Sequence, residues 1–218
     1  MQQGNYIEDI LKSKNKGELK LIMDDLGAKI ENIVNLLENP KFYYGDVKQS
    51  EEYFTLLKLQ DISNQAKGLY RQKFGNIIPS EEDSYRKIFE ARMDDINKIE
   101  FRIGGYFTGI KTYIGKIEAN RVLFEIQGPT IDVKDRQLEK YLENKYSRVD
   151  FLNNLDNVRL WSWSDYYDTS KYGFDIMDGQ QWSLNIDYIN GQEPFHTGGS
   201  NAYPYNFFML LDLFEISY

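Results

Sequence analysis

The spacing of apolar residues changes near residue 100 from a helical period to a strand period, and this change constrains the fold more than any other feature. Before it, apolar side chains recur every three or four residues, which is the pattern of an amphipathic helix. After it, they alternate with polar residues, as in a half-buried strand. The sequence therefore predicts an α+β fold, with a helical region at 1–100 and an α+β domain at 101–218.

Three helices are expected in the helical region. The first carries an apolar stripe from Leu19 to Leu37 and ends at Asn39-Pro40, because proline cannot continue the backbone hydrogen bonds. The second begins after Ser50 and ends near Gly75, and the third begins at the capping run Pro79–Asp83. Short loops between long helices imply antiparallel neighbours.

A mainly antiparallel sheet covered by a C-terminal helix is expected in the α+β domain. Alternation over 106–114 and 122–126 predicts a hairpin, followed by a short helix over 138–146. Further strands are expected at 160–163 and 172–177.

The clearest strand runs from Trp182 to Tyr188, where large apolar side chains alternate with polar ones. Asn190-Gly191 then predicts a tight turn into a return strand over Phe195–Thr197. Pro204 suits the first position of the closing helix, whose apolar residues are expected to cover the sheet.

Part of this C-terminal segment resembles other proteins. The residues concerned are Asp178–Tyr188, then Gly199-Ser200-Asn201-Ala202-Tyr203-Pro204, then Asn206-Phe207. They are similar to a strand–turn–strand–helix ending of uncharacterised bacterial proteins, in which a Trp strand is followed by Gly-x-Asn-x-Tyr-Pro. The resemblance implies a bacterial or phage origin and no particular activity. Within it, Asn201 is expected to bond backbone groups across a bend that Gly199 permits.

Composition excludes several kinds of site. The sequence holds no Cys, which excludes disulfide scaffolds, thiolate nucleophiles and zinc–thiolate sites. A single histidine, His196, excludes multi-histidine metal sites, and no cofactor or metal is expected. No apolar run is long enough to span a membrane, and residues 1–12 lack the features of a secretory signal. A cytoplasmic location without membrane contact is therefore expected.

The last third of the chain carries a charge equal to that of the whole protein. The chain has 26 basic and 34 acidic side chains, a net charge of −8. Residues 150–218 contribute only Arg159 and Lys171 against ten acidic side chains, again −8. Because phosphate contacts need Lys and Arg, this part is expected to attract a basic partner or a metal ion and not nucleic acid. The alternative is an acidic surface that only keeps the protein soluble.

Tyrosines and aspartates are concentrated in one segment of this acidic third. Tyr166, Tyr167 and Tyr172 lie in a polar stretch, and tyrosine at interaction sites combines contact area with a polar tip. The alternative is that these rings pack beneath the loop. The neighbouring carboxylates are those of Asp165, Asp168, Asp175 and Asp178. Their spacing does not fit a Ca²⁺ loop, and cation binding, acid–base chemistry on a glycoside and a solvated acidic loop remain alternatives.

His196 offers a different chemistry. With Ser200 four residues on and Asp187 or Glu193 nearby, it could form a hydrolytic triad, but no Gly-x-Ser-x-Gly elbow presents the serine. The glycines before Ser200 lack the Gly-Lys-Ser/Thr of a nucleotide loop, so they predict a turn. On a hairpin strand, a histidine such as His196 is more often an ordinary edge residue than a catalytic one.

We therefore expect a non-enzymatic intracellular protein whose acidic, tyrosine-rich segment binds a basic protein surface without direct nucleic-acid contact. The partner could be a nucleic-acid-handling protein, whose groove would be blocked by carboxylates in place of phosphates, as by anti-defence or immunity proteins. The expected contact residues are Asp165, Tyr166, Tyr167, Asp168, Tyr172, Asp175 and Asp178. Two alternatives are a hydrolase that uses the carboxylates or His196, and a homodimerisation module formed by the helices.

Overall fold

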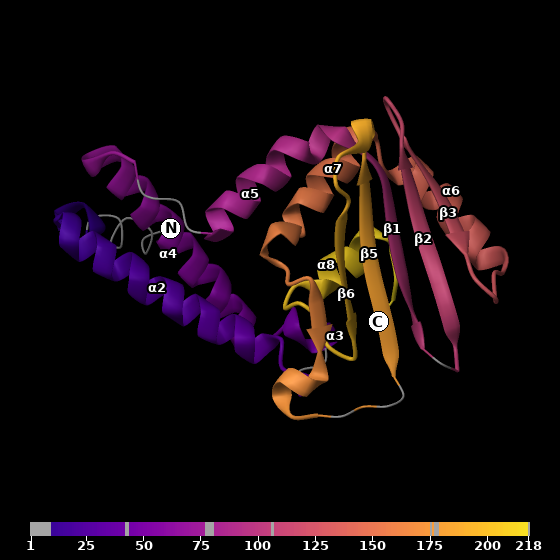
Figure 1. Cartoon of the computed structure of the whole chain (residues 1–218), viewed down its shortest axis with the longest axis horizontal. Helices are drawn as coiled ribbons and strands as arrows, with labels where there is room; N and C mark the ends of the chain where they lie inside the picture. Colours follow the sequence, from indigo (N-terminus) through magenta and orange to yellow (C-terminus); the bar gives the residue numbers. More distant parts are fainter. Residues whose placement is uncertain are drawn as a thin grey trace. The chain divides into compact units, whose positions relative to one another are not determined.

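The computed structural model describes residues 10–41, 44–76, 81–105, 107–174, 176 and 179–217 (Figure 1). The chain forms two compact units, Met1–Ser80 and Glu81–Tyr218. This division precedes the expected boundary between residues 100 and 101, because the third predicted helix, α5 (Glu81–Arg92), packs within the second unit. There it contacts the 3₁₀ turn η2 (Leu160–Ser162), with the ring of Phe89 centred 6.0 Å from that of Trp161.

The described part of the first unit contains helices α2 (Lys16–Leu37), α3 (Tyr44–Val47) and α4 (Glu51–Phe74). Helix α4 begins after Ser50, whose hydroxyl accepts a hydrogen bond from the Tyr53 amide. It ends at Gly75, which has a φ of 86° and so occupies a region that favours glycine. The expected start and end of this helix are therefore confirmed.

Helices α2 and α4 are antiparallel. The ammonium of Lys73, at the end of α4, donates to the carbonyls of Lys12 and Lys14, just before α2 begins. Leu19 and Ala66 lie at the centre of the small core between the two helices and are fully buried.

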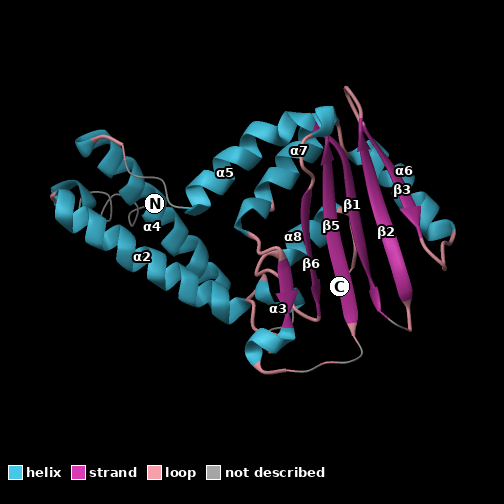
Figure 2. Cartoon of the chain, in the orientation of Figure 1, coloured by secondary structure: helices cyan, strands magenta, loops and turns pink. Residues whose placement is uncertain are grey.

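The described part of the second unit contains a six-stranded sheet and four α-helices, one of which is α5 (Figure 2). Its elements are α5, β1 (Ile96–Gly105), β2 (Gly109–Ile117), β3 (Val122–Gln127), α6 (Val133–Lys145), α7 (Arg148–Asn157), β4 (Tyr166–Asp168), β5 (Gln180–Tyr188), β6 (Phe195–Ser200) and α8 (Phe207–Leu213). The strand order is β3-β2-β1-β5-β6-β4, and every pair is antiparallel except β4 with β6. The predicted α+β fold is confirmed.

Helices cover one face of this sheet. Phe101 of β1 has ring centroids 5.9 Å from Phe207 of α8 and 5.8 Å from Phe214, which follows α8. Phe124 of β3 lies 5.6 Å from Phe151 of α7. Helix α8, which passes behind the strands in Figure 2, therefore closes the core as the sequence predicts.

The opposite face of the sheet carries polar side chains. The Lys98 ammonium lies 2.8 Å from Glu100 and 3.8 Å from Asp187 on the neighbouring strand. Lys116 and Glu125 form a similar pair at 3.0 Å. The alternation of apolar and polar residues in β1 and β5 follows from this one-sided burial.

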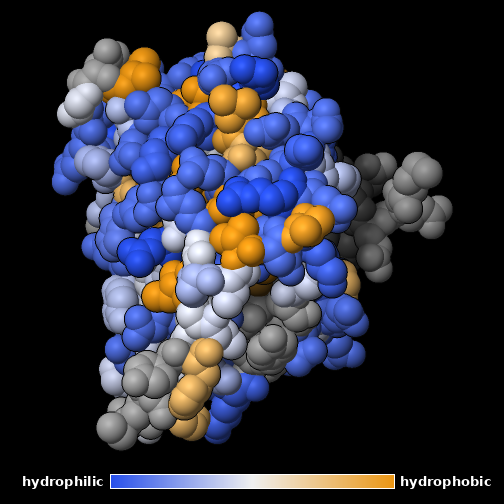
Figure 3. All heavy atoms as spheres, turned by 90° about the vertical axis from the view of Figure 1, so that its right-hand side faces the viewer, coloured by the Kyte–Doolittle hydropathy of each residue, from blue (hydrophilic) through white to orange (hydrophobic). Residues whose placement is uncertain are grey.

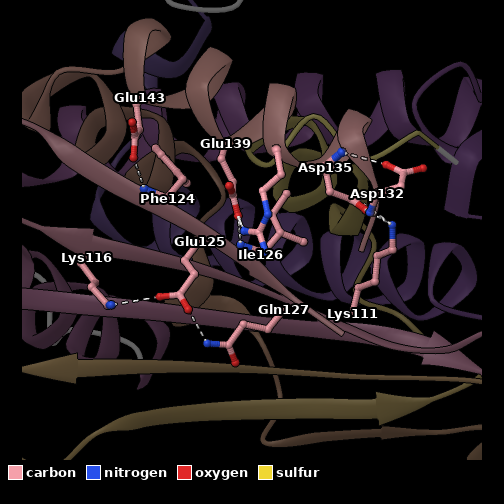
Figure 4. A network of polar contacts seen from close by, with 11 residues as sticks. Lys111, Lys116, Phe124, Glu125, Ile126, Gln127, Asp132, Asp135, Glu139 and Glu143 are labelled. Atoms are coloured by element: carbon pink, nitrogen blue, oxygen red, sulfur yellow. Dashed lines mark hydrogen bonds and ion pairs between the residues drawn. The ribbon is translucent and has the colours of Figure 1, made fainter. Parts of the chain in front are cut away.

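The β3 edge of the sheet is blocked by helix α6. Carboxylate oxygens of Glu139 and Glu143 accept hydrogen bonds from the backbone amides of Ile126 and Phe124, at 2.6 and 3.2 Å (Figure 4). The surface around this edge is largely hydrophilic, with small separated apolar patches (Figure 3). These contacts satisfy backbone donors that another chain could otherwise pair with.

Several predicted elements differ in the structure. Residues 160–163, expected as a strand, begin with η2, because Arg159 has a left-handed φ of 60° and its carbonyl accepts from the Ser162 amide at 2.9 Å. In the stretch 172–177, Tyr172 ends the 3₁₀ helix η3 (Thr169–Tyr172) and positions 175 and 177 lie outside the described residues. Strand β1 and helix α7 were not expected. The closing helix starts at Phe207, whose amide donates to the Pro204 carbonyl in a preceding turn.

Candidate functional site

Strand β4 places the predicted tyrosine–aspartate segment at the second edge of the sheet. Tyr166 pairs in register with Gly198 of β6, and Tyr167 pairs with Gly199. Gly199 is also in register with Trp182, whose side chain lies in the core. Because neighbours in register share a face, Tyr167 faces the core and Tyr166 faces the open side.

The prediction that Tyr167 belongs to an exposed contact surface is wrong. Tyr167 is only 7% exposed, its ring lies 5.8 Å from that of Trp182, and its hydroxyl accepts from the Ser164 amide at 3.0 Å. Tyr166, in contrast, is 59% exposed. Tyr172 is half-buried at the end of η3. Of these three tyrosines, Tyr166 is therefore the exposed one.

The predicted aspartates divide into three groups. Asp168 is exposed and accepts a hydrogen bond of 2.6 Å from the Ser170 amide, which caps η3. Asp165 is exposed, and its carboxylate has no hydrogen-bond or ion-pair partner among the described residues. Asp175 and Asp178 lie outside the described residues. Along the segment, the exposed Tyr166 thus lies between two residues with exposed carboxylates, Asp165 and Asp168.

Other carboxylates of the acidic last third stabilise the fold. Asp187 faces Lys98 across the open sheet face, and Glu215 forms an ion pair with Lys145. The available acidic surface is therefore smaller than the net charge of residues 150–218 indicates.

His196 lies on the open face of β6, and its Nδ1 is 2.6 Å from the Asn185 side-chain oxygen on β5. Ser200 is four positions further along the same strand, so about 13 Å of extended backbone separates the two residues. This geometry does not assemble the serine–histidine pair of a hydrolytic triad.

A groove adjoins the tyrosine–aspartate segment in the second unit. Its cavity volume is about 680 Å³, and it lies between α5, the η2 turn and the start of β6. Ile88 of α5 forms one wall and is 57% exposed, while Asp165 and Glu193 bring carboxylates to it. Sequence reasoning placed Asp165 in the site but missed the groove.

Aromatic side chains form the floor of this groove. Phe89 is 6% exposed, and its ring lies 6.0 Å from Trp161 and 5.9 Å from Phe195. The guanidinium carbons of Arg86 and Arg159 lie 5.3 and 5.8 Å from the Trp161 ring. These contacts hold the floor in place, because cations over a tryptophan face are attracted by its π electrons.

Among the described residues, no arginine forms an ion pair with the groove carboxylates of Asp165 and Glu193. Arg92 stacks 3.8 Å from the centre of the Tyr188 ring and donates from Nε to the Gln192 side chain at 2.9 Å. Its other contact with this region is to the backbone carbonyl of Glu193. The Glu193 carboxylate is exposed and has no hydrogen-bond or ion-pair partner among the described residues.

The carboxyl of Asp156 on α7 has a pKa above its usual value. Burial raises the pKa of this carboxyl, the neighbouring charge of Glu90 raises it further, and Arg86 opposes the change. One of its oxygens is buried without a hydrogen-bond partner among the described residues. The ionised form is therefore disfavoured in the folded protein.

Among the residues that the structure describes, no group of three or more His, Cys, Asp or Glu side chains could hold a metal ion. Within the same residues, no helix has both the length and the apolar character needed to cross a membrane.

Comparison with known proteins gives no further assignment. No protein-family model, curated protein or solved structure matches this chain. The candidate site is therefore defined by its own geometry: an exposed tyrosine and aspartates at a sheet edge, beside a groove with an aromatic floor.

Proposed function

We propose that this protein is a non-enzymatic interaction protein that binds a basic surface of a partner protein through the segment Asp165–Asp168. The position of this segment carries the proposal, because three exposed residues, Asp165, Tyr166 and Asp168, lie together in the chain at one edge of the sheet. Tyrosine supplies large contact area with a polar tip, and carboxylates attract lysine and arginine. The net charge of −8 adds long-range attraction toward a basic partner.

Such a surface suits an inhibitor acting in the cytosol. The carboxylates of Asp165 and Asp168 would occupy the positions on the partner where the phosphates of a nucleic acid otherwise bind, and Tyr166 would add apolar contact. The protein would then block a DNA- or RNA-handling partner, as anti-defence or immunity proteins do. Nucleic acid is not the proposed ligand, because residues 150–218 hold two basic side chains against ten acidic ones.

Affinity capture from the source cells tests this proposal when two variants are compared with the wild type. The first is the triple variant Asp165→Asn/Tyr166→Ala/Asp168→Asn. The matched control removes two exposed carboxylates and one exposed tyrosine elsewhere, as Asp24→Asn/Glu31→Gln/Tyr141→Ala. Each captured protein is then purified and its affinity measured over a range of salt concentrations.

The proposal expects a partner with a basic contact surface, whose binding weakens as salt rises and is lost only in the triple variant. Binding that is insensitive to salt, binding that survives the triple variant, or failure to capture any partner would overturn it. A hydrolase that depends on His196 would show a turnover that is lost in His196→Ala, whereas a protein that only binds its partner has no such turnover.

A further inference from the structure

We infer that the groove beside Asp165 is the second half of the same contact surface, and that it receives a large apolar side chain adjacent to lysine or arginine in a segment of the partner. This inference rests on the proposed function and extends it. It names the partner's chemistry: an apolar anchor next to a cation.

The apolar half of the groove has a solvent-exposed wall and a floor of buried rings. Ile88 is 57% exposed although it lies beside the buried rings of Phe89 and Trp161. An exposed aliphatic side chain next to an aromatic floor favours contact with another apolar group, because this contact removes apolar surface from water. The volume of about 680 Å³ is sufficient for side chains of a docked segment.

The charged half of the groove selects a cation. Asp165 and Glu193 both line it, and neither carboxylate has a partner among the described residues. The nearby Arg92 is held by Tyr188 and Gln192. A lysine or arginine in the occupant would therefore meet two unpaired negative charges.

The same charges decide between two kinds of occupant. A second copy of this chain carries a net charge of −8 and would be repelled. The surface also continues beyond the groove, because Asp165 lines it and the next residue, Tyr166, is exposed on the open sheet face. An extended contact of this kind fits a segment of another, basic protein.

A random twelve-residue peptide library displayed on phage tests the inference with the full-length protein. We expect the selected peptides to contain a large apolar residue within a few positions of lysine or arginine. Ile88→Asp should weaken their binding about tenfold or more, because burial of an isoleucine side chain is lost. Val133→Asp changes an apolar residue on α6 that is still more exposed, at 72%, and should have no effect.

The charged half has its own variants. Asp165→Asn/Glu193→Gln should abolish the preference for basic peptides, whereas Asp24→Asn/Glu31→Gln on α2 removes the same charge and should retain it. Near-ultraviolet circular dichroism of each variant confirms that it is folded.

The outcomes separate this inference from the proposed function. If the selected peptides are basic without an apolar anchor, and Ile88→Asp binds them normally, the groove inference is overturned while the proposed function stands. If they are apolar without basic residues and do not respond to salt, both fail. Selection of no peptide above background also overturns the groove inference.

Discussion

The side chain of Asn206 forms hydrogen bonds with two segments next to the candidate site. Its replacement therefore gives a prediction for the free energy of unfolding. Its side-chain oxygen accepts from the Trp163 indole at 2.8 Å, and its amide donates to the Val158 carbonyl at 2.5 Å. The residue is only 1% exposed. Asn206→Ala leaves one buried donor and one buried acceptor without partners, at about 1–3 kcal/mol each. We therefore expect a loss of about 2–6 kcal/mol in unfolding free energy.

Urea unfolding followed by tryptophan fluorescence measures this loss. All three tryptophans, Trp161, Trp163 and Trp182, lie in the second unit, so the signal reports that unit alone. The control is Asn154→Ala, which removes an exposed side-chain bond of 2.7 Å on α7 and should cost under about 0.5 kcal/mol. A loss below about 1 kcal/mol for Asn206→Ala, with an unchanged denaturant dependence, would refute the reasoning.

Three further predictions concern the second unit. Because burial raises the pKa of Asp156 above its unfolded value, ionisation of this carboxyl destabilises the fold as the pH rises through the folded pKa. Asp156→Asn should therefore raise the melting temperature at pH 7 and lose this advantage near pH 3. An equal gain in melting temperature at both pH values would contradict the assignment. Gly199→Ala should cost about 1–3 kcal/mol in urea unfolding, since an added Cβ would lie 2.7 Å from the Trp182 indole nitrogen. Gly68→Ala on α4, with nothing within 4 Å, should not destabilise the first unit, which holds no tryptophan and is followed by far-ultraviolet circular dichroism. A loss below about 0.5 kcal/mol for Gly199→Ala would show that this crowding is unimportant. Glu139→Ala/Glu143→Ala should expose the β3 edge and promote self-association, and light scattering that matches the wild type would argue against edge protection by α6.

The main elements could be predicted because their signals are local. Ser50 and Gly75 mark the ends of α4 through capping and a left-handed φ, which depend on the residues themselves. Trp182 to Tyr188 alternate because one face of β5 is covered and the other is polar. Asn201 also behaves as expected, since its side-chain oxygen accepts from the Gln180 amide at 2.8 Å.

The remaining features depend on contacts that sequence spacing does not contain. Tyr166 and Tyr167 are chemically alike neighbours, and only the register of β4 against β6 decides which of them is buried. Gly199 is required by the close approach of Trp182 and not by a bend. Ile88 and Asp165 are far apart in the sequence but line the same groove. The apolar stripe of α5 did not show that Ile88 stays exposed.

Nuclear magnetic resonance mapping tests the central claim most directly. A library-selected peptide is titrated into isotopically labelled protein, and the backbone amide shifts are followed. We predict changes concentrated at residues 85–92, 164–168 and 193–196, which line the groove and the adjoining sheet edge. Shifts confined to α6 or to helices α2 and α4, with these three stretches unchanged, would contradict the account.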